Sequence, residues 1–293
     1  MRNSQPAIIH HPSSISLGFS PCPNDCFIFD ALVHNKIDAE GLTFNVELHD
    51  VETLNKKALN NELDITKLSF NAYGHVLNNY ILLRAGSALG FNCGPLLITR
   101  HAERSRSEPL IIHDNSKIAI PGKLTTANFL LSLAYPNLKN KIEYVFSDIE
   151  NAVLSGEVDA GLIIHESRFT YEQKGLKKII DLGEYWESLI HAPIPLGGIV
   201  IKRSFDSEFQ QKINRLIKKS VEYAFANPES SKTYVKAHAQ EMNEEVMQKH
   251  INLYVNNFSI DLGELGTNAI KLMFNKANEI GLFQQNNSRL IID

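Results

Sequence analysis

The feature that most constrains the fold of this chain is a regular alternation of short strand-like runs with helical segments. Runs of β-branched and apolar residues predict strands at residues 15–19, 43–48, 65–68, 96–99, 117–120, 142–145, 160–164 and 198–202. Segments with helical spacing of apolar residues lie between these runs. Because strands that alternate with helices pack in layers, the pattern predicts an α/β fold with mainly parallel sheets.

Two capping-box sequences predict where helices begin. Ser147-Asp-Ile-Glu150 would open a short helix that Gly156 ends, and Ser207-Glu-Phe-Gln210 would open a long one. Apolar residues between positions 209 and 225 keep helical spacing. The chain after Ser207 is almost entirely helical in pattern, so we expect it to pack on an existing sheet.

Composition limits the class of protein and its partners. The 293 residues are enough for two lobes, and 29 Lys and Arg against 33 Asp and Glu leave a formal charge of −4. This balance gives no general attraction for nucleic acid or an anionic membrane. The three cysteines are too few for a disulfide framework, and no secretory signal or apolar run of about 18 residues is visible. We therefore expect a cytoplasmic protein with a loose N-terminal tail.

The order of segments predicts two lobes. Residues 100–116 look like a connection between lobes, and residues 191–197 look like the return. We therefore expect a larger lobe from 1–99 plus 197–293 and a smaller inserted lobe from 100–196. Residues 58–66 and 153–161 also resemble each other, each as a helix end, a turn, an Asp and a strand. The similarity arises either by chance or because both lobes share one topology.

Three polar junctions between strand and helix are candidates for ligand binding. They hold Ser20 and Asn24, then Lys67, Leu68, Ser69 and Asn71, and finally Thr125, Thr126 and Ala127. In parallel sheets such junctions face a cleft, and a helix start offers free N–H groups to an anion. The alternative is that these residues only cap helices, with Lys67 in solvent.

His165 is the candidate acid–base residue because it follows the apolar run 160–164. An imidazole at the carboxyl end of a strand can remove a proton near neutral pH; the alternative is a structural histidine. No pair of histidines has metal-ligand spacing, Cys22 and Cys26 have no second Cys/His pair, and the glycines match no nucleotide motif. We therefore expect no metal and no cofactor.

Several motifs, in order, resemble the 1,4-dihydroxy-6-naphthoate synthase family. They are SPCPND with FIFDALVH, DVETLNKKAL, DITKLSFNAYG, GSALGFNCGPLL, PGKLTTANFLL and GEVDAGLIIHESRFTY. The likeness runs from residue 15 to residue 202 and continues faintly into the helical tail. Cys26 stands where the family is expected to have threonine, and the N-terminal tail is longer than usual.

The resemblance implies a fold similar to type II periplasmic binding proteins, with two α/β lobes and mixed sheets around a central ligand cleft. It implies a cofactor-independent lyase that converts cyclic dehypoxanthinyl futalosine to 1,4-dihydroxy-6-naphthoate in menaquinone biosynthesis. His165 matches the family's proposed base, and residues 67–69 with Thr126 and Ala127 match its substrate contacts. We expect a small carboxylate substrate and a monomer or homodimer. The alternatives are a non-catalytic carboxylate binder of the same fold and the chorismate dehydratase of the same pathway.

Overall fold

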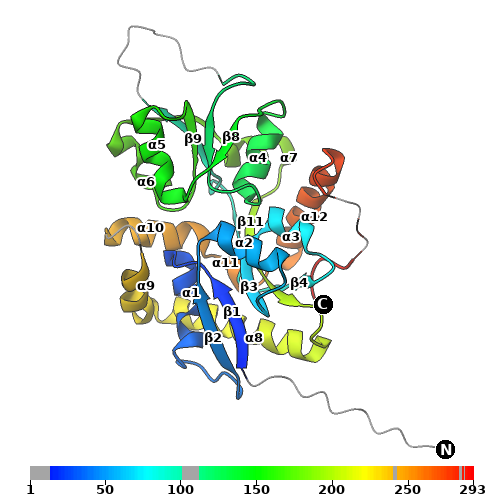
Figure 1. Cartoon of the computed structure of the whole chain (residues 1–293). Helices are drawn as coiled ribbons and strands as arrows, with labels where there is room; N and C mark the ends of the chain where they lie inside the picture. Colours follow the sequence, from blue (N-terminus) through cyan, green and yellow to red (C-terminus); the bar gives the residue numbers. More distant parts are fainter. Residues whose placement is uncertain (1–13, 101–111, 240–242, 284–285, 287) are drawn as a thin grey trace, which may run out of the picture.

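The computed structural model describes residues 14–100, 112–239, 243–283, 286 and 288–293. Within them the chain forms two α/β lobes, one above the other, each built on its own sheet (Figure 1). The expected loose tail lies outside the described residues, as does most of the expected connection 100–116. No helix in the described ranges is long and apolar enough to cross a membrane.

The first lobe begins with alternating strands and helices. These are β1 (Ser14–Phe19), α1 (Pro23–Val33), β2 (Thr43–Leu48), α2 (Val51–Leu59), β3 (Ile65–Ser69), α3 (Phe70–His75), β4 (Tyr80–Leu82) and β5 (Ala88–Gly90). The second lobe holds β6 (Leu96–Arg100), β7 (Ile118–Ile120), α4 (Thr126–Ala134), β8 (Lys141–Glu143), a 3-10 turn at Phe146–Asp148, α5 (Ile149–Ser155), β9 (Ala160–Ile163), α6 (Ser167–Thr170), a 3-10 turn at Tyr171–Lys174, β10 (Leu176–Asp181) and α7 (Leu182–Ile190).

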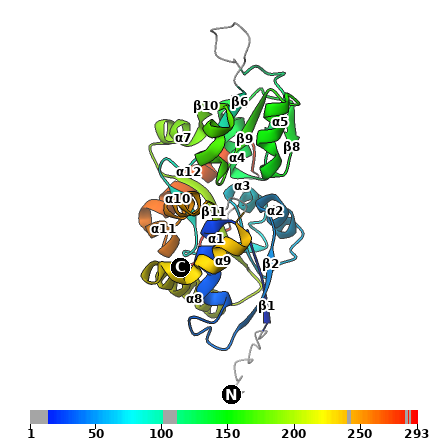
Figure 2. The same ribbon diagram turned by 90° about the vertical axis from the view of Figure 1, so that its left-hand side faces the viewer.

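The chain then returns to the first lobe and ends in helices. The return is β11 (Ile194–Lys202), followed by α8 (Ser207–Ala226), a 3-10 turn at Pro228–Ser231, α9 (Lys232–His238), α10 (Glu244–Tyr254), α11 (Asn257–Ile260) and α12 (Gly263–Glu279). As expected, this tail packs on existing structure: α8, α9 and α10 lie against α1, and α12 lies against β11. Figure 2 shows α10 at the level where the two lobes meet.

Both sheets repeat one topology, which explains the internal similarity. The first has the order β2-β1-β3-β11-β4, with β5 also paired to β11, and the second has the order β10-β6-β9-β7-β8. In each, three parallel strands are followed by an antiparallel one, β11 on β3 and β6 on β9. The two matching aspartates also act alike. Asp64 accepts the N–H of Ser16, and Asp159 accepts the N–H of Lys117, at the starts of β1 and β7.

The sheets differ in four respects from what the strand pattern and the expected lobe boundaries predicted. The sheets are mixed rather than mainly parallel, and the short strands β4 and β5 and the strand β10 were not predicted. Strand β6 belongs to the second sheet, although the expected boundary placed residues 96–99 in the first lobe. Strand β11 joins the first sheet from Ile194 rather than from residue 197. By sheet membership, the chain crosses between lobes at residues 91–95 and 191–193.

The predicted capping boxes are both wrong in detail. Helix α8 is capped by Asp206, whose side chain accepts the N–H of Phe209 at 2.8 Å. Helix α5 follows a 3-10 turn without a side-chain cap, while the Ser147 hydroxyl contacts Asp148. The predicted end is correct, because Gly156 adopts a left-handed φ of 77° at the C-cap of α5.

Candidate active site

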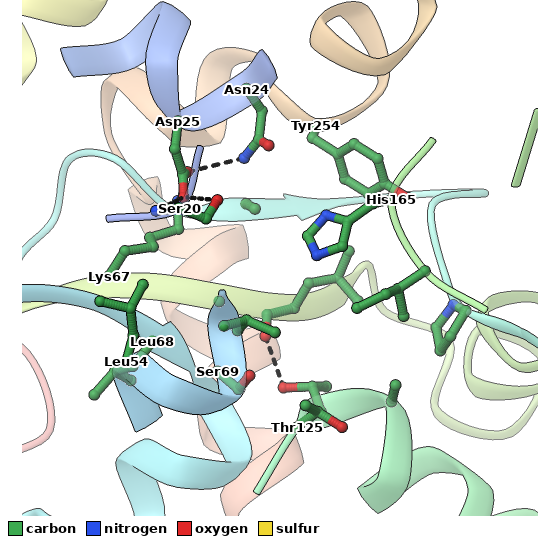
Figure 3. A pocket seen from close by; sticks show the side chains of 18 of the residues that line it. Ser20, Asn24, Asp25, Leu54, Lys67, Leu68, Ser69, Thr125, His165 and Tyr254 are labelled. Atoms are coloured by element: carbon green, nitrogen blue, oxygen red, sulfur yellow. Dashed lines mark hydrogen bonds and ion pairs between the residues drawn. The ribbon is translucent and has the colours of Figure 1, made fainter. Parts of the chain in front are cut away.

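A cavity of about 110 Å³ lies between the two lobes. Both lobes and α10 line it, with Ser20, Asn24, Asp25, Val51, Leu54, Lys67, Leu68, Ser69, Ala88, Cys93, Pro95, Thr125, Thr126, Ala127, Ile164, His165, Leu196, Gly197, His250 and Tyr254. Figure 3 shows His165 and Tyr254 on one side of the cavity, facing Ser69 and Thr125 on the other. The strand-to-helix junctions predicted from the sequence therefore converge on one space.

All but one of the residues singled out from the sequence line this cavity. The exception is Asn71, which lies behind the wall on α3. Its amide nitrogen donates to the backbone oxygens of Lys123 at 3.3 Å and Thr125 at 3.2 Å. Asn71 therefore ties α3 of the first lobe to the loop before α4 of the second.

The first junction is organised around the buried carboxylate of Asp25. This carboxylate accepts the Ser20 hydroxyl at 2.7 Å, the Ser20 N–H at 3.2 Å and the Asn24 amide at 2.9 Å. Lys67 lies 3.1 Å away as an ion-pair partner and also donates to the Gly86 oxygen at 2.8 Å. The side chains of Asp25 and Lys67 are only 3% and 8% exposed. Ser20, Asn24 and Lys67 are thus fixed by one anion before any ligand binds.

A second network joins the lobes beside Ser69. The buried Glu52 carboxylate on α2 accepts the N–H of Leu124 at 3.2 Å and the amide of Asn55 at 3.1 Å. Asn55 in turn accepts the N–H of Ser69 at 3.0 Å. Burial raises the pKa of Glu52, although the hydrogen bonds from Asn55 and Leu124 oppose this rise. The residues that begin α3 and α4 are therefore held in register across the gap between the lobes.

Thr125 and Thr126 have different tasks at the start of α4. Thr125 is the N-cap, since its hydroxyl oxygen accepts the N–H of Asn128 at 3.2 Å, as the capping alternative predicted. The hydroxyl of Thr126 donates to the Leu196 oxygen of β11 at 2.7 Å. Both hydroxyls are thus engaged with protein groups.

His165 occupies a strained position directly after β9 and Ile164. Its backbone φ is 57°, in the left-handed region, which is uncommon for residues other than glycine, although asparagine, aspartate and histidine adopt it more often than the rest. Its ring packs on Phe146 with centroids 4.9 Å apart, and its Nε2 is buried with no hydrogen-bond partner among the described residues. Strain and an unpaired buried nitrogen, both at one cavity, are typical of a functional residue.

The electrostatics of His165 favour the neutral imidazole. Burial lowers its pKa to about 4, while the negative charges of Asp25 and Asp50 oppose part of this shift. A neutral imidazole can accept a proton, so the residue is in its basic form over the whole neutral range.

The sequence-based reading missed important residues of the cavity. Asp25 follows Asn24 but was not among the candidate residues, and His250 and Tyr254 lie on α10 in the tail that we expected only to cover a sheet. Donor atoms of Cys22, His165 and Glu166 also lie within 4.8 Å of one another. These three come from two segments far apart in the chain, so no local spacing could have indicated their proximity.

Comparison with known proteins identifies the family. A family model described as menaquinone biosynthesis matches residues 15–279. The chain belongs to this family. A 1,4-dihydroxy-6-naphthoate synthase of Thermus thermophilus is 44% identical over 269 residues, covering 92% of this chain and 96% of the relative. One of Streptomyces coelicolor is 40% identical over 277 residues, covering 92% and 94%. The resemblance carried by the sequence motifs is thus confirmed.

Solved structures of other proteins share the architecture of this family member. A crystal structure of an Archaeoglobus fulgidus protein aligns with a TM-score of 0.86 at 34% identity, covering 94% of this chain and all of that one (100%). The alkanesulfonate-binding protein SsuA of Xanthomonas axonopodis aligns at 0.68 with 12% identity and 97% coverage of both chains. A Candida albicans protein described as having the generic periplasmic binding protein fold aligns at 0.67 with 13% identity, covering 94% and 92%. The predicted periplasmic-binding-protein-like fold is confirmed.

Proposed function

We propose that this chain is a carbon–carbon lyase that converts cyclic dehypoxanthinyl futalosine to 1,4-dihydroxy-6-naphthoate, with His165 as general base. His165 carries this proposal, because its neutral imidazole lines a cavity between the two lobes and its buried Nε2 has no hydrogen-bond partner among the described residues. Relatives named as 1,4-dihydroxy-6-naphthoate synthases, at 40–44% identity over most of the chain, support the choice of reaction.

The chemistry of the proposed reaction matches the groups in the cavity. A proton must leave the substrate before the carbon–carbon bond to its sugar-derived part breaks. That part is then released, and formation of the aromatic naphthoate drives the reaction forward. His165 accepts that proton. The cavity walls on both lobes keep water away from the reactive anion that forms.

The substrate carboxylate has an anchoring region opposite His165. Ser69 ends β3, and Thr126 and Ala127 begin α4, whose first N–H groups point out of the helix. Lys67 adds a buried positive charge nearby, shared with Asp25. We therefore assign anion binding to the Ser69 and α4 side of the cavity and proton transfer to the His165 side.

The direct test is turnover of purified protein with cyclic dehypoxanthinyl futalosine, with product followed by mass spectrometry. We expect 1,4-dihydroxy-6-naphthoate to form without added cofactor. A parallel incubation with chorismate separates this reaction from the dehydratase of the same pathway. Binding of the futalosine without product would identify a binding protein, and dehydration of chorismate would identify the dehydratase; either result would overturn the proposal.

The pH dependence of kcat/KM should reflect the lowered pKa of His165. The base is lost when the imidazole is protonated, so activity falls as the pH drops through the folded-state pKa of about 4. An ordinary histidine would lose its activity near its usual pKa of about 6.5. We expect kcat/KM to stay nearly constant from pH 7 to pH 5. It is measured at substrate concentrations well below KM, where the rate reflects the ionisation of the free enzyme. An acidic limb centred above pH 6 would contradict the buried, neutral state of this ring.

A further inference from the structure

Besides His165, a second histidine lines the cavity. His250 lies on α10, is 0% exposed, and stacks on His165 with ring centroids 5.9 Å apart and an angle of 15° between the rings. Nothing in the motifs that carry the family resemblance includes this residue. Its position beside the proposed base raises the question of which of its two nitrogens carries the proton.

A chain of hydrogen bonds fixes the answer, starting from the ion pair of Lys67 and Asp25. The Asp25 carboxylate only accepts hydrogen bonds, so the Asn24 atom 2.9 Å from it must be the amide nitrogen. The Asn24 oxygen then points to Nε2 of His250, also at 2.9 Å. Because that oxygen can only accept, Nε2 of His250 must carry the proton and donate.

Nδ1 of His250 is therefore a bare acceptor. It has no hydrogen-bond partner in the described part of the chain. The carboxylate of Glu166 comes within 3.8 Å of it, which is beyond hydrogen-bond length. Burial, together with the nearby His165, lowers the pKa of His250 well below its usual value, so the ring stays neutral. A buried acceptor without a donor is unfavourable, and at the wall of a ligand cavity the ligand can supply the donor.

We propose that His250 is a substrate-binding residue whose Nδ1 accepts a hydrogen bond from a hydroxyl group of the ligand, next to the atom that His165 deprotonates. The inference rests on the proposed function only for the identity of the substrate, whose sugar-derived part carries hydroxyl groups. Two stacked imidazoles then divide the work. His165 takes a proton, and Nδ1 of His250 holds a hydroxyl in place.

Two substitutions separate this role from a purely structural one. Asparagine at position 250 can place an amide oxygen near the Nδ1 position but loses the Nε2 donor. Glutamine can keep a donor near the Nε2 position but loses the Nδ1 acceptor. We expect His250→Gln to lower kcat/KM for cyclic dehypoxanthinyl futalosine at least about tenfold more than His250→Asn, because only the former removes the acceptor. His49→Gln, a partly exposed histidine outside the cavity, serves as the control.

The reverse ranking would overturn the inference, since a residue that only supports Asn24 needs its Nε2 donor. Equal losses in both variants would also count against it. If the wild-type protein shows no turnover, the proposed function is wrong. The inference about His250 is then tested by the tautomer of this residue alone.

The tautomer of His250 is measured on the wild-type protein alone, so the measurement requires neither a folded variant nor substrate. In protein labelled with ¹⁵N-histidine, we expect the His250 spectrum to show a protonated Nε2 and an unprotonated Nδ1 at pH 7. A proton on Nδ1 would overturn the inference whatever the enzyme activity. In the His165→Asn variant, adding cyclic dehypoxanthinyl futalosine should shift the Nδ1 resonance of His250 in the direction of an accepted hydrogen bond. If this resonance stays unchanged while substrate is bound, the inference is contradicted.

Discussion

Replacing His165 with asparagine should lower kcat by about 10²–10⁴-fold, the range that a general base contributes. Asparagine suits this test because it tolerates the left-handed backbone, and the φ of His165 is 57°. The variant therefore removes the imidazole without adding backbone strain. Turnover of cyclic dehypoxanthinyl futalosine is measured at saturating substrate, and binding is measured separately by calorimetry.

The expected pattern is a large loss of kcat with a small change in substrate affinity. His49→Gln is again the matched control, because its ring meets Glu47 at 3.1 Å, outside the residues that line the cavity. A His165→Asn variant that keeps kcat within about tenfold of wild type would show that another group removes the proton. Tyr254, which also lines the cavity, would then be the next residue to test.

Much of this site could be predicted from sequence because of where the strands end. Ser20 follows β1, Ser69 ends β3, and His165 follows β9, all of them parallel strands near the middle of a sheet. The carboxyl ends of such strands form the mouth of a cleft in α/β folds. Recognition of short apolar runs was therefore enough to place these residues near a ligand.

His250 and Tyr254 could not be found in this way. On α10 they share a buried stripe with Met247 and Ile251, at the spacing of any helix that packs against a core. The same pattern describes a core helix and a helix that lines a cavity. Only the tertiary position of α10, which brings His250 against Asn24 and His165, separates the two.

Contacts between the lobes were equally invisible in the sequence. Asn71 was expected to meet the ligand because it follows a strand, yet its amide binds backbone oxygens of the other lobe. Glu52 lies within a helix pattern and gave no signal, although it accepts the N–H of Leu124 across the interface. Such pairs are more than 50 residues apart, so no local rule connects them.

Asp25→Asn should be the most destabilising single change at the site, lowering the free energy of unfolding by about 3–5 kcal/mol. The substitution leaves the Lys67 ammonium buried without its counter-ion, since that side chain is 8% exposed and the ion pair measures 3.1 Å. It also replaces a carboxylate oxygen that accepts from Ser20 or Asn24 with an amide group. Urea unfolding followed by circular dichroism measures the change.

A buried pair should behave differently from an exposed one, and the chain offers both. Glu279→Gln breaks the pair between Lys276 and Glu279, whose side chains are 28% and 61% exposed, and should cost no more than about 1 kcal/mol. The double variant Asp25→Asn with Lys67→Met should recover part of the loss, because no unpaired charge then remains buried. If Asp25→Asn unfolds at the same urea concentration as Glu279→Gln, Asp25 does not organise this side of the cavity. If Asp25→Asn keeps full stability, the Asp25 carboxylate no longer supports the orientation of Asn24, on which the tautomer of His250 depends.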